Sequence, residues 1–181
     1  MSPRARLCKI LVYAAYILLL TLVQTTWPDT LAIAGVRPDL TLVLVASIGF
    51  LFGETDGAAT GLLCGLLLDI QAGRLIGLGM LLLMLSGLLP ALVFHKSSTR
   101  PVLLAPIAVV MAVLLFHTTV YGVSWLYPSL PYLGRNPYEL ADVVGKRILP
   151  LLVLDGLLAI PMALALRYAG PYRRKQLEVI E

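Results

Sequence analysis

The sequence predicts an all-α fold, a polytopic membrane protein whose six transmembrane helices form one bundle. The chain is 59% hydrophobic and 13% charged, with a mean hydropathy of +0.91, whereas soluble domains have about 25% charged residues. Apolar stretches recur along its whole length, and no polar tract is long enough to form a second domain. We therefore expect a single integral membrane domain over residues 1–181.

Six apolar stretches are expected to form the spans: 7–27, 39–53, 57–70, 75–94, 102–125 and 147–167. The first, fourth, fifth and sixth approach the ~20 residues that cross a bilayer. The second and third cover only about 21 Å each, so they must thin the bilayer, lie behind longer neighbours or form a re-entrant hairpin. Their connector "GETDG" carries Glu54 and Asp56, which a half-depth hairpin would strand in hydrocarbon. Two true spans are favoured, with Asp56 as the N-cap of the second.

The basic residues predict the orientation of these spans. The N-terminus begins like a signal peptide, but its apolar core is too long and no A-x-A site follows, so it is expected to stay as the first span. Both termini are then cytoplasmic, because basic residues concentrate on that side. The cytoplasmic set is Arg4, Arg6, Lys9, Lys96, Arg100, Arg167, Arg173, Arg174 and Lys175, against Arg37, Arg74, Arg135, Lys146 and Arg147 outside.

Several functional classes are disfavoured. The net charge of +4 comes from basic residues at segment ends, which does not suit nucleic-acid binding but suits contact with lipid headgroups. Cys8 and Cys64 have no paired spacing, so no disulfide, metal site or other cofactor is expected. HExxH, G-x-S-x-G and P-loop motifs are missing, and we predict a protein that is not an enzyme.

A glycine ridge marks the third span. Its members lie four residues apart and therefore share one helix face, where small residues let another helix approach closely. The predicted packing ridge is Gly57, Gly61, Gly65 and Asp69, with Gly73 just beyond it.

Charged residues gather at the predicted outer face. Arg37, Asp39, Asp69 and Arg74 all lie at outer ends of segments. We favour an outer ion-pair cluster, since charges inside membranes usually pair. The alternative is that Asp69 simply ends a helix in water.

A buried polar pair is expected between the last two spans. His117 and Asp155 are each roughly 10–12 Å below the outer surface. A hydrogen bond that joins the two helices is favoured over a proton relay or ligand site, because no further acids form a chain with them.

The connection from Trp125 to Leu140 is rich in aromatic residues and prolines. Its aromatic members, Trp125, Tyr127, Tyr132 and Tyr138, suit an interfacial belt. They also suit a partner-docking surface, and the two roles are compatible.

Taken in order, these features resemble the MreD family of bacterial rod-shape-determining proteins. The resemblance lies in "RPDL", which opens the second span, and in "GLLCGLLLDIQAGRLIGLG", and the six-span plan covers nearly the whole chain. Matching positions are Pro38, Asp39, Gly61, Gly65, Asp69, Gly73 and Gly77. Leu75 stands where the family often has proline, and Met80 where it has alanine.

The resemblance implies a non-enzymatic scaffold or regulator of cell elongation in the bacterial cytoplasmic (inner) membrane. Its implied partners are MreC, the elongation-specific glycosyltransferase and transpeptidase and, indirectly, MreB, and a homodimer is left open. The function would be support of lateral peptidoglycan synthesis and rod shape.

The resemblance also implies a bundle similar to the substrate-binding component of energy-coupling-factor transporters. A small-molecule, vitamin-type transporter component is therefore the alternative function. Such a component should carry an alanine-spaced stripe on its first helix, and here Ala14 and Ala15 are adjacent with no alanine four residues on.

Overall fold

The computed structural model describes residues 3–26, 32, 36–72, 77–94, 102–126 and 144–170. Within these ranges the chain is helical, and the six predicted segments appear as six α-helices. A short 3₁₀ turn, η2 (Val102–Leu104), and a π-helical turn, η3 (Val144–Ile148), precede the last two of them. The α-helices are α1 (Pro3–Thr26), α2 (Leu40–Phe52), α3 (Glu54–Ala72), α4 (Leu78–Val93), α5 (Ala105–Leu126) and α7 (Leu149–Ala169).

Helix α2 lies at the centre of the bundle. It packs against each of the other five α-helices, and every residue from Leu40 to Phe50 is buried. Its 13 residues span only about 20 Å. Neighbouring helices enclose α2, as the explanation that it lies behind longer neighbours predicts.

The connection between α2 and α3 is a single glycine. Gly53 has a φ of 107°, a conformation that side-chain-bearing residues rarely adopt. Its amide still donates to the Gly49 carbonyl, and α3 begins at the next residue. This abrupt reversal brings the start of α3 against the end of α2.

Contacts at the helix ends define the direction of each helix. Gln24, near the end of α1, bonds the Leu40 amide at the start of α2. Tyr13, earlier in α1, packs against Phe52 at the end of α2, so α1 and α2 are antiparallel.

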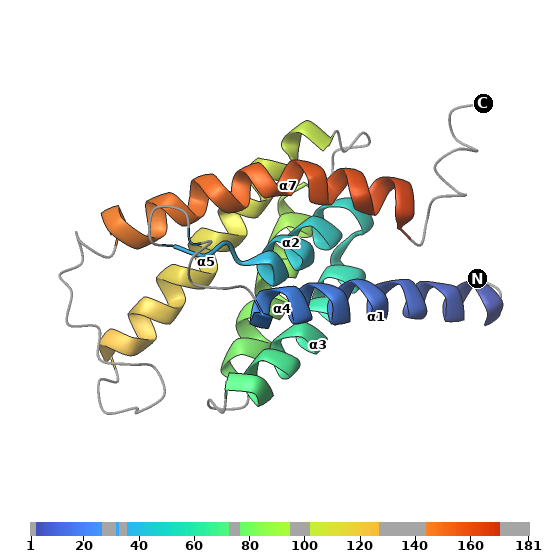
Figure 1. The fold of residues 1–181 in the computed structure, drawn as a ribbon, viewed down its shortest axis with the longest axis horizontal. Coiled ribbons are helices and arrows are strands. Elements are labelled where there is room, and N and C mark those ends of the chain that lie inside the picture. Colours follow the sequence, from blue (N-terminus) through green and yellow to red (C-terminus); the bar gives the residue numbers. More distant parts are fainter. Residues whose placement is uncertain are drawn as a thin grey trace.

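Asp155 of α7 bonds Asp39 at the start of α2. A Cβ on Gly170, just after α7, would lie 3.0 Å from Phe52 at the end of α2, so α7 runs in the same direction as α2. In Figure 1 the beginning of α1 and the end of α7 accordingly lie at the same end of the molecule.

Three helices in the described ranges are long and apolar enough to cross a membrane: Leu7–Thr26, Val102–Leu126 and Leu149–Ala169. They also expose the most apolar surface, including leucines of α1 that are about 60% exposed. In a bilayer this surface faces lipid or a partner helix. Helices α2 and α4 are apolar but shorter, and they lie against other helices over much of their surface.

Candidate functional site

The glycine ridge of α3 lies directly against the backbone of α4. A Cβ atom on Gly61 would lie within 3.0 Å of backbone atoms of Leu83 and Met84, and one on Gly65 would meet the backbone of Gly79 and Met80. The register is regular, because each step of four residues along α3 matches a step of about four residues back along α4. The two backbones are therefore in contact, which only glycine permits at these positions.

Gly49 of α2 and Gly87 of α4 complete this contact. The predicted packing ridge did not include them. A Cβ on Gly57 would meet both the Gly87 carbonyl of α4 and the Gly49 Cα of α2. Gly49 and Gly87 face each other equally closely. Helices α2, α3 and α4, here called the inner triplet, thus meet at three glycines. The glycine spacing in α3 identifies a packing ridge, but it does not identify the helices that pack against that ridge.

Asp69 joins the end of α3 to the start of α4. Its Oδ2 atom accepts hydrogen bonds from the backbone amides of Gly77, at 2.9 Å, and Met80, at 3.2 Å. Free amides at the start of a helix favour a negative group. The carboxylate is 5% exposed and its Oδ1 lies where a Cβ on Gly79 would be, so Gly79 makes room for it.

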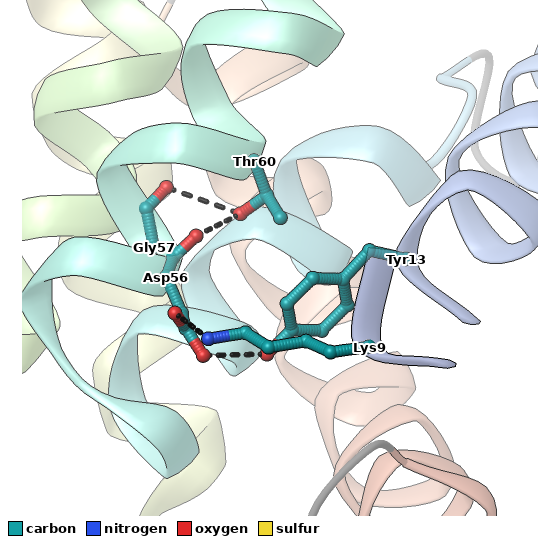
Figure 2. A network of polar contacts seen from close by, with 5 residues as sticks. All are labelled: Lys9, Tyr13, Asp56, Gly57 and Thr60. Carbon is teal, nitrogen blue, oxygen red and sulfur yellow. Dashed lines mark hydrogen bonds and ion pairs between the residues drawn. The ribbon is translucent and has the colours of Figure 1, made fainter. Parts of the chain in front are cut away.

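A second polar contact, at the opposite end of α3, holds α1. The Lys9 ammonium lies 2.6 Å from Asp56 Oδ1, and the Tyr13 hydroxyl donates to Oδ2 at 2.8 Å. Figure 2 shows both side chains reaching from α1 to the same carboxylate, with the Thr60 hydroxyl donating to the backbone carbonyls of Asp56 and Gly57. Charge-assisted bonds of this kind are about twice as strong as neutral ones.

The predicted N-cap role of Asp56 is wrong. Helix α3 begins two residues earlier, at Glu54, so Asp56 lies within its first turn and its side chain is free to reach α1. The sequence contained a usable signal, because Lys9 and Asp56 both fall at the predicted cytoplasmic ends of their spans.

A third polar contact joins α1, α2 and α7 at the start of α2. Asp39 caps the helix by accepting from the Leu42 amide, while its own amide donates to Asp155 Oδ1 at 2.9 Å. The Gln24 side chain accepts from the Leu40 amide and donates to the Pro38 carbonyl. One helix start therefore receives polar side chains from two other helices.

The predicted outer ion-pair cluster is not what the structure gives. Asp39 and Asp69 direct their described hydrogen bonds to backbone amides at the starts of α2 and α4 instead of to guanidinium groups. Arg37 is exposed, and Arg74 lies outside the described residues. The physical reason is that a helix start offers several unpaired N–H donors, which charge counting does not reveal.

The predicted hydrogen bond between His117 and Asp155 is also absent. His117 Nε2 and Asp155 Oδ2 are both buried without a hydrogen-bond partner in the described part of the chain, and Asp155 Oδ1 is bonded to Asp39. A Cβ on Gly156, the residue after Asp155, would lie 3.4 Å from the Val110 side chain of α5, seven residues before His117. Counting residues from the predicted outer surface therefore did not give the packing register of α5 and α7.

Of the remaining predicted site residues, only Trp125 lies within the described ranges. Trp125, in the last turn of α5, is 73% exposed, as an interfacial residue would be. Gly73 and the tyrosines at 127, 132 and 138 lie outside the described residues. Within the described ranges, no group of three or more His, Cys, Asp or Glu side chains has the arrangement to hold a metal ion.

The sequence model of one family, described as rod shape-determining protein MreD, matches residues 5–168. The chain belongs to the MreD family. No curated protein and no solved structure matches it.

Membership in the MreD family implies a role in rod-shape determination. The matched region extends from α1 to the last turn of α7. All three polar contacts and the whole inner triplet are therefore part of the MreD-like region.

Proposed function

We propose that this MreD-family protein is a non-enzymatic scaffold of the cell-elongation machinery that binds MreC and supports lateral peptidoglycan synthesis. The family match over residues 5–168 carries the proposal. The elongation-specific glycosyltransferase and transpeptidase are proposed as further partners, with MreB reached indirectly. A scaffold needs a fixed shape and free surface, and the structure supplies features that suit both.

The inner triplet supports the fixed shape. Its helices touch through backbone atoms at glycines, and the side chains of Asp56, Asp69 and Asp155 bond groups at its ends. Close-packed interiors have little freedom to rearrange.

The outer helices supply the free surface. Helices α1, α5 and α7 expose leucines, isoleucines and valines along much of their length. In the membrane, helix association depends on shape and on small or polar contacts, since lipid is as apolar as leucine. We propose that one of these faces receives a partner's transmembrane helix.

We also propose six membrane crossings with both termini in the cytoplasm. The alternating directions of α1, α2 and α3, and the parallel course of α2 and α7, support an even number of crossings. Reporter fusions after residues 53, 98 and 170, which we expect to be cytoplasmic, and after residues 30, 74 and 135, which we expect outside, test this topology. A cytoplasmic signal at residue 74 would contradict the proposal that α3 crosses the membrane.

The partner test is affinity purification of the tagged, full-length protein from its native membrane, followed by mass spectrometry of proteins and small molecules. We expect MreC and elongation synthases at near-stoichiometric recovery. Recovery of ATPase subunits, or of a stoichiometric vitamin-sized ligand, would contradict the scaffold and favour a transporter component.

A further inference from the structure

Asp155 is a carboxyl group buried within α7. The residue is fully buried, and its Oδ2 atom has no hydrogen-bond partner within the described ranges. Its Oδ1 atom accepts one backbone amide, that of Asp39. A charged carboxylate in such a place, with one oxygen unsatisfied, is strongly disfavoured.

A second carboxyl group lies beside it. Because Asp155 accepts from the Asp39 amide at 2.9 Å, both side chains converge on the start of α2. The Asp39 carboxylate caps that helix through the Leu42 amide, where negative charge is favourable. Two carboxylates that share one buried site do not both ionise readily.

No basic side chain among the described residues donates a hydrogen bond to Asp155 Oδ2, and Oδ1 accepts the Asp39 amide. Helix α5 carries His117, whose Nε2 is itself buried and unpartnered in the described chain. Arg147 of η3 is exposed. From α1, Tyr16 bonds the carbonyl of Ala165, ten residues further along α7.

We propose that Asp155 is a proton-binding site. In the folded protein it is a neutral carboxylic acid that accepts the Asp39 amide through Oδ1 and carries a hydrogen atom on Oδ2. Release of that proton leaves two adjacent carboxylates, which repel each other and weaken the contact between α2 and α7. A metal cation is not favoured, because hard cations such as Ca²⁺ need about six oxygen ligands and this site offers the free oxygens of two carboxyl groups.

Infrared spectroscopy of the full chain in lipid nanodiscs tests the proposal directly. A protonated carboxyl group has a carbonyl stretch that is distinct from the carboxylate bands. We expect this band in the wild type at neutral pH, its loss in Asp155→Asn, and its persistence in Asp69→Asn. Asp69 is the matched control, because it is also a buried aspartate, and its Oδ2 atom already accepts two backbone amides. A wild type without the band would overturn the proposal whether or not either variant folds.

The pH dependence of unfolding supplies the second arm. A group that binds its proton more tightly in the folded state stabilises the fold at low pH, and this stabilisation is lost as the pH rises. As the pH rises above about 3.9, the ordinary pKa of an aspartate side chain, the wild type should therefore lose more stability than Asp155→Asn does. Equal pH dependence in both would overturn the proposal. Stabilisation of the wild type by sodium chloride at constant ionic strength, absent in Asp155→Asn, would overturn it too, in favour of a sodium site.

Discussion

The inner triplet and the three outer helices solve the problem of packing in a membrane in different ways. In the inner triplet, backbones touch at Gly49, Gly57 and Gly87. The outer helices α1, α5 and α7 contact the bundle through side chains, many of them alanines on α5 and α7, and leave broad apolar faces exposed. Lipid gives little drive to bring apolar side chains together. The inner triplet therefore gains stability from close van der Waals contact and end contacts, while the outer helices keep surface available for partners.

This difference in packing is clearest when glycines of the inner triplet are compared with a glycine of an outer helix. Gly61 and Gly65 have α4 backbone atoms where a Cβ would be, whereas Gly122 on α5 has nothing within 4 Å. Gly61→Leu combined with Gly65→Leu should be the most destabilising change, because overpacking costs about 1–3 kcal/mol per site and backbone cannot move aside as a side chain can. Unfolding in mixed SDS micelles measures the loss.

Gly122→Leu is the matched control. It adds the same side chain to an open, exposed position in a helix interior, where leucine is also the better helix former. A similar loss of stability in both variants would mean that leucine itself, and not the α3–α4 contact, is harmful.

The contact between α1 and the inner triplet should be the next most sensitive. Asp56→Ala removes the partner of both Lys9 and Tyr13 and should lower the free energy of unfolding by about 2–3 kcal/mol, since bonds to charged groups contribute about 1.5–3 kcal/mol. Glu54→Ala, two residues away and exposed, should have little effect. Equal effects in a mixed-micelle titration would contradict the assigned role of Asp56.

The α4 start should respond to Asp69. Asp69→Ala leaves the Gly77 and Met80 amides without their acceptor and should cost about 1–3 kcal/mol. Asp69→Asn keeps an acceptor oxygen and should retain most of the stability. If both variants were equally unstable, the negative charge, and not the hydrogen bonds, would dominate.

The smallest effect is expected at the contact between α1 and α7. The Tyr16 hydroxyl donates to the Ala165 carbonyl at 3.2 Å in an exposed setting, so Tyr16→Phe should cost no more than about 1 kcal/mol. A loss as large as that of Asp56→Ala would show that α1 is held from both sides with equal strength.

Much of the architecture was predictable because apolar length alone marks membrane helices. All six segments appear as helices, with ends displaced by a few residues. The glycine spacing likewise indicated which face of α3 packs closely. Its partners Gly79 and Gly87 on α4 could not be predicted in the same way, since periodicity in one helix says nothing about the register of the next.

The polar contacts were less predictable, for two physical reasons. Backbone amides at helix starts compete for carboxylates, so Asp39 and Asp69 bind N–H groups where charge counting predicts arginine. Counting residues from a predicted membrane face does not determine how two helices pack, and Gly156, beside Asp155, lies against Val110 of α5 instead of His117. Lys9 and Asp56 both lie at the predicted cytoplasmic ends of their spans, and they form an ion pair. Comparing the predicted depths of charged residues would therefore have identified this pair.

The most direct test is recovery of MreC with the tagged protein from native membranes, compared at matched expression among the wild type, Gly122→Leu and the double variant Gly61→Leu with Gly65→Leu. We expect Gly122→Leu to retain MreC at the wild-type ratio and the double variant to lose it, because the scaffold depends on the closely packed inner triplet. Normal recovery of MreC by the double variant would contradict that dependence.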